Sequence, residues 1–297
     1  MSAKNRILTL TEGTTSIDVW TIGARLNAVS WKGHDGLVDG SATVAEATGA
    51  KLNNGCVVGP VANRIAGAAF DLGGRTYRFA ANEGADTLLH SGDRSLRDAV
   101  WEVVSSDRSS VSLAADVADM ADGFPGNRRF EARYRVVDDG FDLEITAVSD
   151  APTMVNLALH PYWRLDAGGR EGLSLQIKAD AYLPVDAKKI PTGEIAPVAG
   201  TMFDLRKASV PDTGIDHNFC LSPASVDAPS AELLSERLRL TLWTDAPGLQ
   251  VYAGNSTGIA IEPQHWPDAM HHANFPSVRL APGETYRQVT RYRFGAR

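Results

Sequence analysis

Apolar and polar residues alternate with a period of two over many short segments of this chain. Apolar residues occupy every second position in 130–136, 141–147, 173–177 and 238–242. Successive side chains of a strand point to opposite faces of a sheet, so such segments are typical of half-buried antiparallel strands. The pattern predicts a protein that is built mainly from strands.

Turn-forming pairs separate these segments. They are Gly73-Gly74, Asp139-Gly140, Gly168-Gly169 and Pro282-Gly283. The pair Asp139-Gly140 lies between two alternating segments and predicts a β-hairpin.

Helical periodicity is scarce, and the best candidate for a helix is Val226–Arg237, with Ser230 as its N-cap. Many short strands with few helices indicate a sandwich or a barrel. No shift in composition and no low-complexity linker divides the chain. We therefore expect an all-β fold, a large antiparallel β-sandwich with few short helices, as a single domain over residues 1–297.

The composition narrows the classes of function. With 43% hydrophobic and 22% charged residues and a net charge of -7, the chain has an ordinary globular composition without the basic face of a nucleic-acid-binding protein. No window approaches the roughly 20 apolar residues of a membrane span, and residues 1–12 lack the apolar core of a signal peptide. We expect a cytoplasmic protein.

Cys56 and Cys220 form no CxxC pair, and we expect buried free thiols.

A carboxylate ends the short apolar segment Ile-Ala-Ile at 259–261. Glu262 is followed at once by Pro-Gln-His-Trp-Pro. A lone carboxylate on a rigid, apolar element is poorly solvated, which suits a general base. Gln264 is its i+2 neighbour and faces the same side of an extended chain.

Two further polar residues stand beside apolar segments. His160 ends an apolar run within 152–165, and a histidine near its ordinary pKa of about 6.5 exchanges protons at neutral pH. Asp216 begins the segment Asp-His-Asn-Phe, where it either binds a ligand or serves as a turn residue. A structural role remains the alternative for His160 as well.

Asn63 and Arg64 follow a Gly-Pro turn in the segment 59–67, and His90 lies in the segment 82–92. The planar fork of donors on arginine suits hydroxyl or carboxylate oxygens, although most arginines form surface ion pairs. A histidine bonded within a turn is the alternative for His90.

Together these five segments resemble the aldose 1-epimerase (galactose mutarotase) family, in the same order along the chain. The segment 59–67 is similar to the family's Asn-Arg-Ile motif, 82–92 to its Asn-x-Gly-x-x-x-Leu-His-Gly-Gly run, and 259–269 to its C-terminal signature. The segment 152–165 is similar to the block Thr-x-x-x-Asn-x-x-x-His-x-Tyr-Phe-Asn-Leu. Ser91, Trp163 and Arg164 depart from the pattern, standing in place of Gly, Phe and Asn.

The resemblance implies a fold and a set of roles. The fold would be the supersandwich of galactose mutarotases, with Glu262 as the general base, His160 as the general acid and His90 as a supporting histidine. The predicted substrate-binding residues are Arg64, Asn63, Asp216 and Gln264. The substrate would be a monosaccharide, with no cofactor and no metal, and the protein would be a monomer or a homodimer. Trp163 is a candidate either for packing on the sugar or for filling the core.

Three other interpretations remain at this stage. A glycoside hydrolase would use Asp216 and Glu262 as its two carboxyl groups, roughly 5–9.5 Å apart. A non-catalytic carbohydrate-binding β-sandwich is compatible with the same fold. An epimerase of a sugar phosphate would need additional arginines at the rim of the pocket.

His265, His271 and His272 lack the spacing of common zinc sites, so we expect no metal there.

Overall fold

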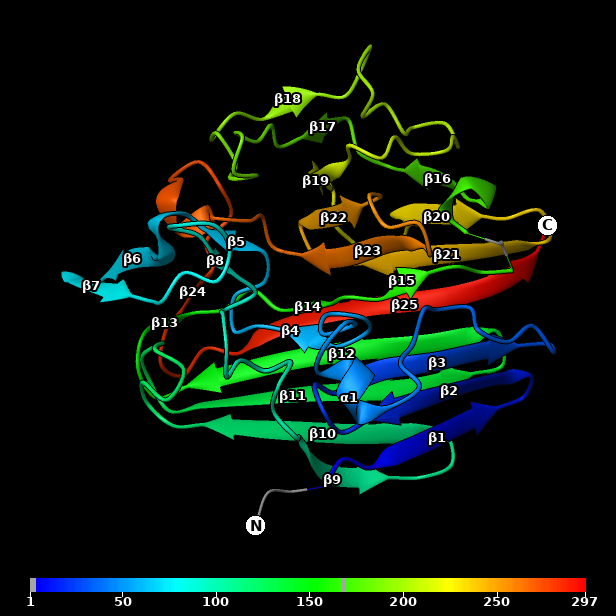
Figure 1. Ribbon diagram of the computed structural model, residues 1–297, viewed down its shortest axis with the longest axis horizontal. Coiled ribbons are helices and arrows are strands. Elements are labelled where there is room, and N and C mark those ends of the chain that lie inside the picture. Colours follow the sequence, from blue (N-terminus) through cyan, green and yellow to red (C-terminus); the bar gives the residue numbers. More distant parts are fainter. Residues whose placement is uncertain (1–3, 167–168) are drawn as a thin grey trace.

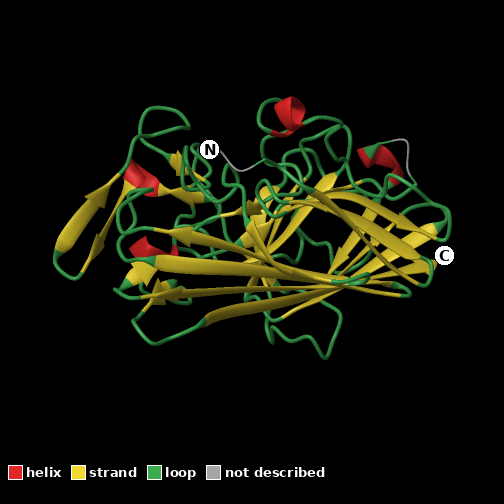
Figure 2. Cartoon of the chain, turned by 90° about the horizontal axis from the view of Figure 1, so that it is seen from below, coloured by secondary structure: helices red, strands yellow, loops and turns green. Residues whose placement is uncertain are grey.

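Antiparallel strands dominate the computed structural model, which describes residues 4–166 and 169–297. The helical elements are short: α1 (Val44–Ala47) and the 3₁₀ turns η1 (Ala66–Ala68), η2 (Arg170–Gly172) and η3 (Ala269–His271). The all-β prediction, with a sandwich of antiparallel sheets and few short helices, is confirmed. Figure 2 shows the strands running in layers, with the short helices in the loops outside them.

The strands in the first half of the chain are β1 (Ile7–Glu12), β2 (Thr15–Trp20), β3 (Arg25–Trp31), β4 (Val57–Val58), β5 (Arg64–Ile65), β6 (Ala69–Leu72), β7 (Arg75–Arg78), β8 (Leu88–Leu89), β9 (Glu102–Ser106), β10 (Ser110–Val117), β11 (Arg128–Val137) and β12 (Gly140–Ser149). The remaining strands are β13 (Thr153–Met154), β14 (Ala158–Leu159), β15 (Tyr162–Trp163), β16 (Ser174–Ile177), β17 (Ala181–Tyr182), β18 (Ala196–Pro197), β19 (Asp216–Cys220), β20 (Ala231–Leu234), β21 (Leu238–Thr244), β22 (Gly248–Tyr252), β23 (Ile259–Gln264), β24 (Arg279–Leu280) and β25 (Tyr286–Ala296).

The largest sheet has eight strands in the order β16-β20-β21-β25-β12-β11-β10-β9. Its three longest strands, β11, β12 and β25, cross the middle of Figure 1. The predicted hairpin at Asp139-Gly140 is confirmed, since β11 pairs with β12 and Val137 stands opposite Gly140. The turn at Gly73-Gly74 joins β6 to β7 as predicted. Gly168, in another predicted turn, lies outside the described residues.

The predicted helix at Val226–Arg237 is wrong, because this segment contains strand β20. Ala231 and Leu233 are buried while Glu232 and Leu234 are half-buried, which is the alternation of a strand. The strand pairs with both β16 and β21. Residues with good helical propensity form a strand here because pairing on both sides outweighs the small difference in intrinsic preference.

A second sheet, of six strands in the order β15-β23-β22-β19-β17-β18, packs with one face on the large sheet. Its inward side chains include Val251, Ile259 and Ile261, which belong to the main hydrophobic core. At the seam, the Trp163 ring lies 6.5 Å from that of Phe141, measured between centroids. A second hydrophobic cluster joins Cys220 of β19 in this sheet to Phe70 and Leu88 from the first half of the chain and to Ala269 of η3.

Cys56 and Cys220 are both buried and free, as predicted. Burial raises the pKa of the Cys56 thiol to about 11 and that of Cys220 to about 12, so both stay protonated. Within the described ranges, no helix is long and apolar enough to cross a membrane.

Candidate active site

A cavity of about 290 Å³ lies over the outer face of the six-stranded sheet. It is lined by Asn53, Asn63, Arg64, Leu89, His90, His160, Tyr162, Lys189, Asp216, Tyr252 and Glu262. Strands β5, β8, β15, β19, β22 and β23 supply six of these residues, and the connecting loops supply the other five, Asn53, Asn63, His90, His160 and Lys189. The structure thus brings together six of the seven residues that the sequence predicted for the site.

Glu262 reaches the cavity because β23 has two different faces. Ile259 and Ile261 point into the main core, so Glu262 points to the opposite face, next to Gln250 on β22. Its side chain is only 2% exposed. Burial raises the pKa of Glu262 well above its usual range, and the charge of Asp216 raises it further, while Arg64 opposes the shift.

His160 lies beside this carboxyl group, with its Nε2 3.4 Å from Oε1 of Glu262. Its backbone is fixed on both sides, since its N–H donates to Cys56 O and its C=O accepts from Gly55 N. Burial lowers the pKa of His160 to about 4, and the charges of Arg97 and Arg25 contribute in the same direction. The two groups therefore share one proton at neutral pH, because burial disfavours the charged form of each.

His90 is held as a neutral ring next to His160. The two ring centroids are 5.2 Å apart, with the planes nearly perpendicular. Nδ1 of His90 accepts a hydrogen bond from the Asn63 N–H at 3.1 Å, which places the ring proton on Nε2. Burial lowers the pKa of His90 well below its usual value. The ring is thus a hydrogen-bond donor toward a ligand, in keeping with the predicted supporting role.

Arg64 and Asp216 form one ionic network at the cavity wall. Glu83 receives a bidentate bond from Arg64, with N–O distances of 2.6 and 2.9 Å. Nη1 of Arg64 also lies 3.3 Å from Oδ2 of Asp216. Asn63 accepts the backbone N–H of Arg64 through its side-chain oxygen. The network fixes the guanidinium and carboxylate that face the cavity before a ligand arrives, which reduces the entropy lost on binding.

Gln250 was missed by the sequence analysis, although it contacts a site residue. It lies opposite Glu262 on β22 and donates to Oδ1 of Asp216 at 2.7 Å. Gln264 does point to the same side of β23 as Glu262, but it is fully buried and does not line the cavity. The structure does not bring it together with the other predicted binding residues.

Comparisons with known proteins decide the family. A family model described as aldose 1-epimerase matches residues 6–293. The chain belongs to the aldose 1-epimerase family. A galactose mutarotase of Sus scrofa is 34% identical, over 94% of this chain and 90% of its own, and an aldose 1-epimerase of Escherichia coli is 32% identical, over 81% and 79%. The crystal structure of a GalM/aldose epimerase homologue from C. elegans matches with a TM-score of 0.92 at 26% identity, covering 99% of both chains.

This aldose 1-epimerase family member is an isomerase, as the sequence resemblance implied. Both oxygens of Asp216 are engaged, one by Arg64 and one by Gln250.

Two departures from the family pattern have structural explanations. Trp163 is completely buried among Phe141 and Tyr292, so the suggestion that it packs on a sugar is wrong and the core role is confirmed. Ser91 has a left-handed backbone with φ of +63°, which glycine adopts at lower cost. Its hydroxyl compensates by accepting from the N–H of Val61 and donating to the C=O of the same residue.

Ser91→Ala is expected to lower the free energy of unfolding by about 1–3 kcal/mol, because it leaves the buried N–H and C=O of Val61 unpaired. Ser91→Gly loses the same bonds but relieves the backbone strain, so it is expected to be less destabilising by up to about 1 kcal/mol. Urea unfolding measures both values. Wild-type stability in the alanine variant would show that these bonds contribute nothing.

The histidines near the C-terminus have structural contacts. Nδ1 of His271 lies 2.7 Å from Oδ1 of Asp268, and the ring of His272 packs on Phe275 with centroids 4.6 Å apart. In the part of the chain that the structure describes, no group of three or more His, Cys, Asp or Glu side chains is arranged to hold a metal ion.

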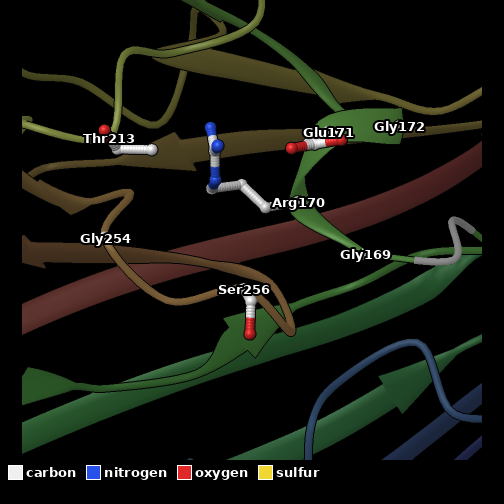
Figure 3. Close-up of a pocket in the computed structure, with 7 residues that line it drawn as sticks. All are labelled: Gly169, Arg170, Glu171, Gly172, Thr213, Gly254 and Ser256. Carbon is white, nitrogen blue, oxygen red and sulfur yellow. The ribbon is translucent and has the colours of Figure 1, made fainter.

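A larger hollow, of about 490 Å³, lies among the loops near η2. Figure 3 shows Arg170 reaching into it between Thr213 and Glu171. It contains one acidic group and no histidine, so it lacks a partner for acid–base catalysis. Size alone therefore does not identify the active site, whereas the adjacent base and acid in the smaller cavity do.

Proposed function

We propose that Glu262 and His160 interconvert the α and β anomers of a free aldose by opening and closing its ring. The contact between His160 Nε2 and Glu262 Oε1 carries this proposal. The two oxygens that exchange protons in this reaction are both bonded to C1 of the sugar. The base that takes a proton from one of these oxygens and the acid that gives a proton to the other must therefore be close neighbours. Glu262 and His160 are close neighbours in this sense.

The proposed reaction moves one proton in each direction. In the reactive form of the pair, the shared proton is on His160 and Glu262 is ionised. Glu262 removes the proton from the C1 hydroxyl while the bond from C1 to the ring oxygen breaks, and His160 delivers its proton to that oxygen. Rotation about the C1–C2 bond then presents the other face of the aldehyde. Closure reverses both transfers and restores the site. Each positioned group supplies roughly 10²–10⁴-fold in rate.

The surrounding residues position the sugar. The proton on Nε2 of His90 is available to an oxygen near C1, and Arg64 and Asp216 present charged groups to ring hydroxyls. The sugar is a monosaccharide in this proposal, because the cavity of about 290 Å³ is at the small end for ligand pockets. The single domain, the cytoplasmic location and the monomer or homodimer stay predictions.

Polarimetry tests the proposal directly. Fresh α-glucose, α-galactose, arabinose, xylose and rhamnose are followed with and without the protein. We expect the protein to accelerate the change in rotation for at least one of them. No acceleration for any of these five neutral sugars, and none for the charged sugar galacturonate, would contradict the proposed function.

The dependence of kcat/KM on pH is expected to be a broad plateau with two limbs. Activity needs one proton on the pair of Glu262 and His160. The acid limb is the gain of a second proton, and because the pKa of His160 is lowered to about 4, the decline is expected only near pH 4. The basic limb is the loss of the shared proton, at the raised pKa of Glu262. An acid limb at about 6.5, the ordinary value for histidine, would contradict this description of the site.

Arg64→Ala is expected to raise KM by roughly 10–100-fold and to lower kcat less, because it removes charge-assisted bonds to the sugar. Steady-state kinetics on the preferred sugar measures both constants. Arg164→Ala is the matched control, since its side chain is 40% exposed and does not line the cavity. An unchanged KM in Arg64→Ala would return this arginine to a purely structural role.

A further inference from the structure

Lys189 stands at the rim of the proposed active site on the loop between β17 and β18. The loop is fixed at this point, since Oδ1 of Asp186 accepts the N–H groups of Lys188 and Ile190. Lys189 itself has a left-handed backbone with φ of +63° and donates its N–H to Asp186 O. Its half-buried side chain lines both the catalytic cavity and a neighbouring hollow that includes residues 83–87.

The other cations at this rim are neutralised by carboxylates. Arg64 is paired with Glu83 and Asp216, and Lys188 contacts Asp86 at 2.7 Å. Lys189 has no ion pair with any residue that the structure describes.

Three carboxylates that line the same two hollows as Lys189, those of Glu83, Asp86 and Asp216, are already paired with other cations. The charge of Lys189 acts on His217, whose pKa is lowered to about 4, by burial first and by Lys189 second, so this ring is neutral. The carboxylate of the adjacent Asp216 is already bonded to Arg64 and Gln250. A half-buried ammonium without a partner loses hydration and gains nothing in return, unless a ligand supplies the missing charge.

The position of Lys189 relative to the catalytic pair indicates where that charge would be. Glu262 lies on β23, whereas Lys189 lies on the loop that follows β17, and β22 and β19 separate these two strands in the six-stranded sheet. Lys189 therefore lies at the end of the cavity away from Glu262. If C1 of the sugar lies at Glu262 and His160, the far end of the sugar, with its exocyclic carbon, lies nearest to Lys189.

We propose that Lys189 binds an anionic group at the end of the aldose remote from C1, so that the preferred substrate is a sugar acid or a sugar phosphate. This inference rests on the proposed mutarotase function, which sets the orientation of the sugar. Carboxylate and phosphate share the required chemistry. An ammonium is a compact point charge with three donors and accepts either group without the geometric demands of a guanidinium.

The test compares galactose, galacturonate and galactose 6-phosphate as substrates. NMR exchange between the two anomeric proton signals gives kcat/KM for each. We expect kcat/KM for at least one of the anionic sugars to exceed that for galactose by roughly 5–30-fold. This is the effect expected from one partly exposed contact between the Lys189 ammonium and an anionic group. The preference is expected to decrease at high ionic strength.

Two variants separate the role of Lys189 from general electrostatic attraction. Lys189→Met keeps the length of the side chain without its charge, and the ratio of anionic to neutral kcat/KM is expected to fall to about 1. Lys188→Met is the matched control, because that lysine is bound to Asp86 and lines only the neighbouring hollow. It is expected to keep the wild-type ratio.

The outcomes distinguish this inference from the proposed function. Calorimetric titration with the same three sugars gives the ratio of affinities without turnover, so a failure of mutarotation does not hide a preference for anions. A preference for galacturonate alone identifies a carboxylate, and one for galactose 6-phosphate alone identifies a phosphate. If neither anionic sugar binds or reacts better than galactose, or if Lys189→Met keeps the preference, the inference is overturned.

Discussion

Replacing Glu262 by glutamine is expected to reduce kcat by about 10²–10⁴-fold, with little change in KM. The amide keeps the shape and the buried position of the carboxyl group but cannot take the proton of the C1 hydroxyl. Because burial already opposes ionisation of Glu262, the neutral amide is expected to leave the folded state at least as stable as in the wild type. Polarimetry or NMR exchange on the preferred sugar measures the rate.

Glu102→Gln is the matched control for this change. Glu102 lies on β9, is exposed and does not line the cavity, so its loss is expected to leave kcat within about twofold of wild type. A Glu262→Gln enzyme with nearly normal turnover would show that another group is the base. A loss of the folded state in this variant would contradict the stability argument.

His160→Gln is expected to produce a decrease in kcat of similar size, again about 10²–10⁴-fold. The side chain has few structural duties, since Nδ1 has no partner among the described residues and Nε2 faces Glu262. Its removal should therefore affect proton transfer to the ring oxygen more than stability. The acid limb of the pH profile is expected to disappear, because it is the protonation of this ring.

The matched control is His34→Gln. His34 is a half-buried histidine in a different hollow, near Asp166 and Arg237, and its replacement is expected to leave the pH profile unchanged. If His160→Gln kept the acid limb, the titrating group would be elsewhere. His160 would then be a positioning residue and not the acid.

The sequence predicted most of the site because its residues sit on elements with strong local signals. Glu262 follows an apolar run that forms β23, and the strand must bury Ile259 and Ile261, so the carboxylate is forced to the other face. His160 directly follows the two-residue buried strand β14. In β23, the alternation of the strand fixes the direction of the Glu262 side chain from the sequence alone.

The residues that the sequence missed depend on strand register and loop position. Gln250 reaches the site because it stands opposite Glu262 and beside Asn218, and this pairing is not visible in one segment. Lys189 lies in a loop whose path over the cavity follows from distant contacts. Gln264 was predicted to bind the substrate and does not line the cavity. The prediction of the strand face on which it lies was correct, but its side chain is fully buried.

The predicted helix and the predicted sugar-stacking residue failed for a related physical reason. Val226–Arg237 has local helical signals, yet β20 is paired on both sides within the large sheet. Trp163 was a candidate for both roles, and the packing of two sheets against each other placed it in the core. Tertiary packing outweighs local preference in both segments.

The double variant Glu262→Gln with His160→Gln tests the central claim most directly. The two proton transfers belong to one step of the reaction, so removing either group also removes most of the contribution of the other. We therefore expect kcat of the double variant to be about as low as that of the slower single variant. Polarimetric rates for the wild type, the two single variants and the double variant complete the cycle. If the two losses multiplied, so that the double variant were slower by the product of both factors, Glu262 and His160 would act independently and the account would be contradicted.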